Sequence, residues 1–196
     1  MYNQTSQKGY SLIEVMIAVA ILMMAIVAPM TIAIKSIQSS QYTLEQNTAI
    51  FLAQEGISII EALRNHYALA SFDDISVDPW EWTTNLSDCD SQFGCNFDAS
   101  DPLNIAVGSP DTVACSEEGT NCVLYYDGES SVRSAYRTDN SSGVDSGFTR
   151  RVFFEGYDVN ADVLNVLVEV EWDSHFLGKV QRVSIRSSFY NLYGGF

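Results

Sequence analysis

A single carboxylate interrupts an otherwise apolar stretch near the amino terminus. Glu14 is followed by Val15–Ile34, in which no residue is charged. A carboxylate near the middle of a membrane costs on the order of 2.5–3.5 kcal/mol, so such a residue usually has a partner. If the chain were cut after Gly9, Tyr10 would become a free amino terminus one helical turn before Glu14, where an acid suits the helix dipole. Glu14 would then supply a counter-charge for a terminal amine, its own or that of a neighbouring molecule.

Four cysteines form two close pairs in the sequence, Cys89/Cys95 and Cys115/Cys122. Four cysteines allow three pairings. Each local pair lies in a stretch rich in Gly, Asp or Ser, which can bend tightly enough to bring its two sulfurs together. Tetrahedral zinc is the alternative, but the gaps are longer than those of a zinc ribbon and no His is near either pair. The sequence favours two local disulfides, which indicate an oxidising compartment outside the cytoplasm.

A third group that could do chemistry is Asp158, Asn160 and Asp162, followed by Glu169. Their spacing is that of the acidic positions in a calcium-binding loop. The turn glycine of such a loop is Val163 here, and Glu169 falls within a predicted strand. A polar turn between two strands explains the same residues, so calcium is the weaker interpretation, here and in the other acidic loops. We expect no other cofactor.

The sequence offers little for catalysis. Its two histidines, His66 and His175, are expected at a helix end and in a loop between strands. Neither is near a Ser or Cys in a recognisable nucleophile setting, and the chain has no GxSxG elbow or phosphate-binding glycine loop. We therefore expect a protein that is not an enzyme.

The charge balance is strongly acidic. Asp and Glu total 25 against 10 Lys and Arg, for a formal net charge of −15. Such a chain repels phosphate backbones, so no direct binding of nucleic acid is expected. No Lys or Arg occurs from His66 to Val132. The simplest interpretation of that acidic stretch is a well-solvated polar surface.

The element that must position Glu14 is an apolar helix. Twenty residues at about 1.5 Å per residue span the roughly 30 Å hydrocarbon layer of a membrane, and Val15–Ile34 has that length. A cleaved secretory signal is one alternative, because Ala18-Val19-Ala20 offers a cleavage site. Cleavage there would leave a very apolar new amino terminus, which is a poor start for a soluble protein. A plain single-pass anchor is the other alternative, and it has no use for Glu14.

The string from Lys8 to Val15, KGYSLIEV, resembles the cleavage and methylation motif of type IV prepilins. In that family a prepilin peptidase cuts after the glycine and methylates the new first residue, usually Phe. The resemblance implies that Gly9 ends the leader, that Tyr10 is N-methylated and that Glu14 guides assembly. Tyr in place of Phe keeps the aromatic ring. Pro29 falls slightly earlier than the proline that pilins often carry, and it predicts a bend in the helix.

The expected fold is α+β, with a long N-terminal helix packed on an antiparallel β-sheet domain in a pilin-like layout. The predicted parts are a leader over residues 1–9, a transmembrane and filament-core helix over 10–34, an amphipathic continuation over 35–70, an irregular acidic region with both cysteine pairs over 71–122, and an antiparallel sheet over 123–196.

Helical spacing predicts one apolar stripe in the continuation, which should pack on the globular domain with the helix ending around residues 65–70. Gly56 in this stripe should let another backbone approach closely, and Trp80 and Trp82 should anchor the core. The sheet should be a meander whose first hairpin turns at Asp127-Gly128. The stripe comprises Leu52, Gly56, Ile59, Ile60 and Leu63, and the expected strands cover 123–126, 131–138, 151–157, 163–172 and 183–189, with a loop over 140–147.

Two further strings resemble minor subunits. LAQEGI from Leu52 resembles the helix continuation of PilV-like minor pilins. VLVEVEWDSHFLGKVQRVSIRSSFY from Val166 resembles the C-terminal hairpin of PilV-like and type II secretion I-type minor subunits. The resemblance implies a filament subunit, with minor pilin as the first expectation and a pseudopilin for secretion or DNA uptake, or a tip adhesin, as alternatives. A lone membrane receptor is a further alternative.

The expected partners of this protein, as a filament subunit, are other pilin subunits, prepilin peptidase and the inner-membrane assembly machinery. Its expected location is the inner (cytoplasmic) membrane before assembly, with residues 1–9 inside, and an extracytoplasmic filament afterwards.

Overall fold

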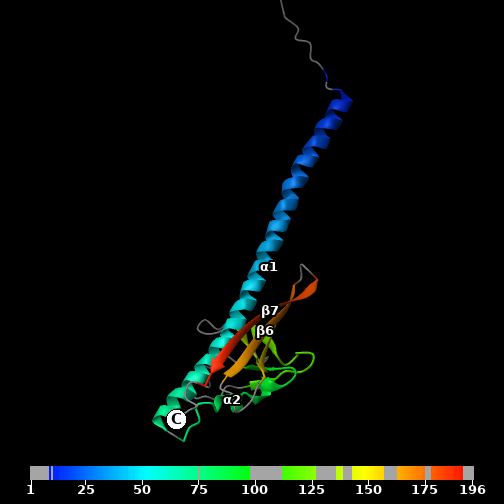
Figure 1. Ribbon diagram of the computed structural model, residues 1–196. Coiled ribbons are helices and arrows are strands. Elements are labelled where there is room, and N and C mark those ends of the chain that lie inside the picture. The colour runs from blue at the N-terminus through cyan, green and yellow to red at the C-terminus, as the bar shows by residue number, and fades with distance from the viewer. Residues whose placement is uncertain are drawn as a thin grey trace, which may run out of the picture. The chain divides into compact units, whose positions relative to one another are not determined.

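The computed structural model describes residue 9 and residues 11–74, 76–97, 112–126, 136–138, 143–156, 163–174 and 178–191, without the side chain of Ala28. The chain divides into two compact units, Met1–Leu44 and Glu45–Phe196, and each is treated by itself below. Figure 1 shows one long helix and a set of strands. The expected α+β, pilin-like class with an antiparallel sheet is confirmed.

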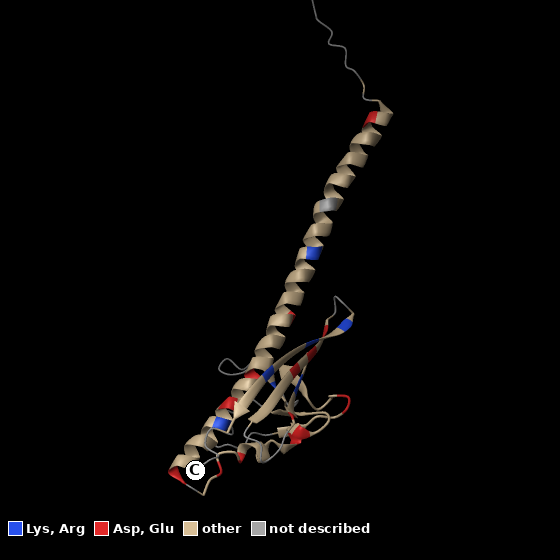
Figure 2. Ribbon diagram, in the orientation of Figure 1, with Lys and Arg blue, Asp and Glu red and all other residues tan. Residues whose placement is uncertain are grey.

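Helix α1 covers Leu12–Asp73 and is the longest element of the chain. It ends three residues later than expected, and Asp74 then bonds back to the carbonyl of Ala70 at 3.0 Å. The helix is long and apolar enough in its first half to cross a membrane by length and composition. It continues through Pro29, so the proline does not end it, and the bend expected there stays a prediction. On residues 12–44 the charged side chains are Glu14 and Lys35, the red and blue bands on that part of α1 in Figure 2.

The second unit is built on a seven-stranded antiparallel sheet. Strand β5 is its centre, because β6 pairs with one edge while β3 and β1 share the other. Beyond β6 lies β7, and beyond β1 and β3 lie β2 and β4. Between α1 and the sheet the chain forms a short helix α2 and a 3₁₀ turn η1. Their bounds are α2 Trp82–Asn85, η1 Ser87–Asp90, β1 Cys95–Phe97, β2 Thr112–Ala114, β3 Val123–Tyr126, β4 Tyr136–Arg137, β5 Val144–Glu155, β6 Val163–Ser174 and β7 Lys179–Tyr190.

The connectivity differs from the expected meander. Strand β3 pairs with both β4 and β5, so β4 lies at an edge and not between its neighbours in sequence. Tyr126 pairs with Tyr136, which rules out the two-residue hairpin turn at Asp127-Gly128. Strands β1 and β2 belong to the sheet although they fall within 71–122, and β5 begins at Val144, inside the expected loop over 140–147. Strands β1 and β2 were missed because segments of three residues are too short to show a clear alternation of apolar and polar residues.

The expected apolar stripe of α1 is confirmed as its buried face. Its four large residues are each 5% exposed or less, and Gly56 is buried as well. A Cβ added at Gly56 would lie 3.1 Å from Cγ1 of Val168. The glycine therefore makes room for a side chain of β6, whereas the sequence predicted the close approach of another backbone. Alternation along β6 buries Val166, Val168 and Val170. The core therefore lies between one face of α1 and one face of the sheet.

Both tryptophans anchor this core as expected. Trp82 is fully buried, and its ring lies 6.3 Å from that of Phe154 and 6.0 Å from that of Phe189. Trp80 packs edge-on against Trp82 at 5.2 Å. Aromatic pairs at these separations add about 0.5–1.5 kcal/mol each beyond the apolar area that they bury. The two residues lie at the start of α2, so they reach the core from a turn and a short helix.

Arg150 is the main surprise of the interior. It occupies an inward-facing position of β5, between the buried Phe148 and Val152, and its side chain is 1% exposed. An unpaired buried cation is strongly unfavourable. Glu55 of α1 pairs with it, at 2.9 Å. The ion pair connects the helix to the sheet. No sequence pattern predicts it, because Glu55 and Arg150 are far apart along the chain.

Candidate functional site

The segment around Gly9 forms the approach to helix α1. Gly9 is exposed, with no atom within 4 Å of the position that a Cβ would occupy. The helix starts at Leu12, and the carbonyl of Ser11 accepts bonds from the backbone N–H groups of Glu14 at 3.0 Å and Val15 at 3.3 Å. Tyr10 lies outside the described residues. Gly9 thus lies before the helix, with open space on the side where a Cβ would stand.

Glu14 lies in the first turn of α1, where the helix dipole favours a negative charge. Its side chain is exposed, and no ion pair to it is found within the described part of the chain. It adjoins an open apolar groove along the helix, which Val15, Ala18, Val19 and Leu22 also line. The carboxylate therefore stands at the head of an apolar surface and is free to meet a cation from outside this chain.

The large apolar side chains of residues 12–37 are exposed within the part of the chain that the structure describes. Leu12 is 79% exposed, Met24 74% and Ile32 70%. Contiguous exposed apolar surface of this extent marks contact with a membrane or another protein. The arrangement suits a helix that is surrounded by lipid at one stage and by other helices at another.

Both expected disulfides are present in the structure. Cys89 is joined to Cys95, and Cys115 to Cys122. Cys89, Cys95 and Cys122 are fully buried, and Cys115 is 6% exposed. The first bridge ties η1 to β1, and the second closes the loop that follows β2. Zinc is therefore not needed to explain these cysteines.

The remaining candidates have less to support them. Asp158, Asn160 and Asp162 lie outside the described residues, as does His175. Among the residues that the structure describes, no group of three or more His, Cys, Asp or Glu side chains is placed to hold a metal ion. His66 lies within α1, with its ring edge-on to that of Tyr67 at 5.5 Å. The described residues therefore add no support for a calcium site or for a catalytic histidine.

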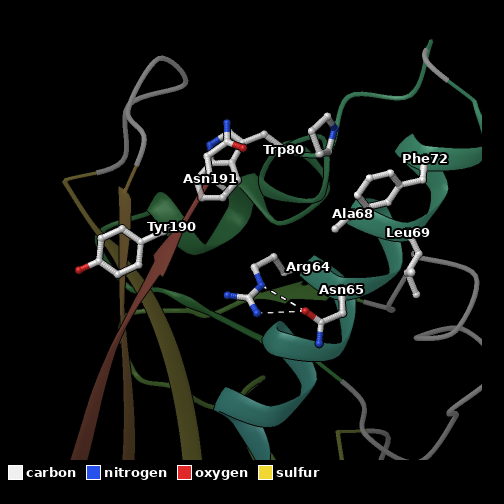
Figure 3. A pocket seen from close by; sticks show the side chains of 9 residues that line it. Arg64, Asn65, Ala68, Leu69, Phe72, Trp80, Tyr190 and Asn191 are labelled. Atoms are coloured by element: carbon white, nitrogen blue, oxygen red, sulfur yellow. Dashed lines mark hydrogen bonds between the residues drawn. The ribbon is translucent and has the colours of Figure 1, made fainter. Parts of the chain in front are cut away.

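A pocket of about 340 Å³ opens at the C-terminal end of α1 in the second unit (Figure 3). Residues from α1, from the turn before α2 and from the end of β7 surround it. Sequence reasoning missed it, because its walls come from segments about 120 residues apart and no short motif marks them. The lining residues are Arg64, Asn65, Ala68, Leu69, Phe72, Pro79, Trp80, Tyr190 and Asn191.

Comparison with protein families finds a match at the amino terminus. The prokaryotic N-terminal methylation motif matches residues 4–28, which include Gly9, Tyr10 and Glu14. No curated protein and no solved structure matches the chain. The matched stretch begins before the exposed Gly9 and extends into the apolar half of α1. The chain therefore joins a type IV prepilin-like N-terminal motif to a pilin-like α+β fold, a combination that implies processing by prepilin peptidase and assembly with other pilins.

Proposed function

We propose that this protein is a prepilin-type structural subunit, a minor pilin, of a type IV pilus or a related filament. Prepilin peptidase cuts the chain after Gly9 and methylates the new amino terminus at Tyr10. The observation that carries the proposal is the methylation motif over residues 4–28, placed at the head of an exposed apolar helix whose first turn holds Glu14. The resemblance of LAQEGI and of the β6–β7 region to minor subunits favours the minor class.

The precursor sits in the inner membrane through Val15–Ile34, with its globular unit outside the cytoplasm. The two disulfides suit that location, because such bonds persist in oxidising compartments. Removal of residues 1–9 places a free amine close to Glu14. In the filament the apolar helices bundle together, and Glu14 neutralises the amine of an adjacent subunit. A paired charge in this apolar setting is far less costly than a lone one.

Mass spectrometry of the mature amino terminus tests the processing step. In a strain with an active prepilin peptidase, the mature chain should begin with N-methyl-tyrosine at Tyr10. Gly9→Ala should accumulate the uncut precursor, whereas Lys8→Ala, next to it, should leave cutting intact. An unprocessed Met1 terminus in the wild-type chain would overturn the proposal.

A binding role is the second candidate, and the β1–β2 hairpin makes it testable. Phe97 pairs with Thr112, so the 14 residues between them are not needed to connect the two strands. Deleting the whole of 71–122 would remove β1 and the buried Trp82, and would therefore test only folding. Replacing 98–111 with Asn-Gly keeps the hairpin register. A tip adhesin should lose adhesion and keep its filaments, whereas a purely structural subunit should keep both.

A further inference from the structure

The pocket at the end of α1 carries hydrogen-bond donors that the described chain does not use. In Figure 3 the Arg64 guanidinium extends from α1, and dashed lines join it to the Asn65 amide. Nε and Nη2 of Arg64 donate to Oδ1 of Asn65 at 3.3 and 3.0 Å, and its Cζ lies 5.5 Å from the centre of the Phe189 ring. Within the described residues Nη1 has no acceptor. No ion pair to Arg64 is found among the residues that the structure describes.

Trp80 supplies a second unused donor. It lines the same pocket and is 6% exposed, and its buried Nε1 has no acceptor among the described residues. A buried N–H without a partner is unfavourable by about the value of a hydrogen bond, so tryptophans in such positions usually have one. Nη1 of Arg64 is therefore the donor that a ligand in the pocket could use, whereas surrounding atoms cover the Trp80 N–H.

The walls of the pocket are apolar and unusually exposed. Leu69 is 68% exposed, Phe72 69% and Tyr190 55%, although each is a large side chain beside a cavity. None of the described residues that line the pocket is Asp or Glu, in a chain whose net charge is −15. The described lining of this pocket therefore combines a cation with apolar surface.

We propose that this pocket binds a carboxylate carried on an apolar or aromatic group. Arg64 receives the carboxylate through a charge-assisted bond. Phe72 and Tyr190 cover the apolar group. The same chemistry occurs at the C-terminus of a peptide that ends in an aromatic residue and in a free aromatic acid. This inference concerns the second unit alone and does not depend on filament assembly.

The test uses the full mature chain in detergent micelles, labelled with ¹⁵N at tryptophan. The Trp80 indole signal is assigned from Trp80→Phe, and N-acetyl-phenylalanine is titrated against N-acetyl-phenylalaninamide. The acid should shift that signal to saturation, and the amide should bind at least about tenfold more weakly, because it lacks the charge that pairs with Arg64. A short peptide ending in Phe with a free carboxylate, compared with the free acid, shows which of the two sources is preferred.

Arg64→Gln should weaken binding of the acid by about tenfold or more and leave the amide unchanged, with Arg64→Lys intermediate. Arg182→Gln, an exposed arginine of β7 outside the pocket, is the matched control and should bind as the wild type does. Equal affinity for acid and amide, or full binding by Arg64→Gln with an unchanged wild-type fold, would overturn the proposal. Tighter binding by at least tenfold after truncation behind Asn191 would also overturn it, because residues 192–196 would then be the occupant.

Discussion

Nη1 of Arg150 lies 2.9 Å from Oε2 of Glu55, which joins strand β5 to helix α1 inside the core. The rest of the guanidinium is satisfied as well. Nε donates to Oδ1 of Asn96 at 2.9 Å, and Nη2 to the carbonyl of Phe97 at 2.7 Å. One side chain therefore holds the helix, β1 and β5 in a fixed relation, and it does so through charge-assisted bonds.

Arg150→Met should lower the free energy of unfolding by about 3 kcal/mol, because it removes the cation that pairs with Glu55 and the bonds to Asn96 and Phe97. Urea unfolding of the mature chain in mild detergent, followed by tryptophan fluorescence, measures the change. Arg182→Gln is the control. Arg182 bonds to Glu171 on the exposed face of β6 and β7, and such pairs contribute no more than about 1 kcal/mol. If both variants lost the same free energy of unfolding, the buried Arg150–Glu55 pair would contribute no more to stability than an exposed pair.

The contact of Gly56 with Val168 should appear as an energetic coupling. Gly56→Ala gains about 1 kcal/mol of helix propensity, but its Cβ would meet Cγ1 of Val168 at 3.1 Å. The two effects should nearly cancel. In Val168→Ala the obstacle is gone, so Gly56→Ala should then stabilise the chain, with a coupling of about 0.5 kcal/mol or more. Additive effects in this double-mutant cycle would contradict the contact.

Each disulfide should contribute about 2.5 kcal/mol to the free energy of unfolding. The two bridges close loops with sequence separations of 6 and 7 residues, and chain entropy gives about this value for such short loops. Replacing Cys89 and Cys95 together by Ala, or Cys115 and Cys122 together, should cause losses of similar size. Because three of the four sulfurs are fully buried, thiol labelling after mild reduction should proceed only where denaturant is present.

The elements that could be predicted from the sequence are those with a long regular pattern. Helix α1, its buried stripe and strand β6 each repeat one hydrophobic period over many residues, and burial on a single face follows from that period. The motif around Gly9 and Glu14 was equally visible, because the required residue types fall within a few positions of one another.

What the sequence did not reveal depends on contacts between distant segments. Strand β1 pairs with β5 and receives bonds from Arg150, and a disulfide ends in or next to each of β1 and β2. Strand β4 is two residues long. The buried state of Arg150 depends on Glu55, and the pocket around Arg64 needs the end of β7. Neither local propensity nor spacing records such pairings, so the topology around β5 and the pocket could come only from the structure.

Glu14→Ala should separate assembly from every earlier step. The variant should still be inserted, cut after Gly9 and methylated, since the cleaved bond lies before the helix. It should then fail to form filaments, with at least about a tenfold loss in the sheared surface fraction. An amine without a counter-charge among apolar helices costs several kcal/mol, which is more than this factor requires. Immunoblots of sheared and membrane fractions, with electron microscopy, measure the outcome. Ile13→Ala, its apolar neighbour, is the control and should assemble. Normal filaments from Glu14→Ala would show that this carboxylate has no part in assembly, and a lone membrane receptor would then be the better account of the anchor.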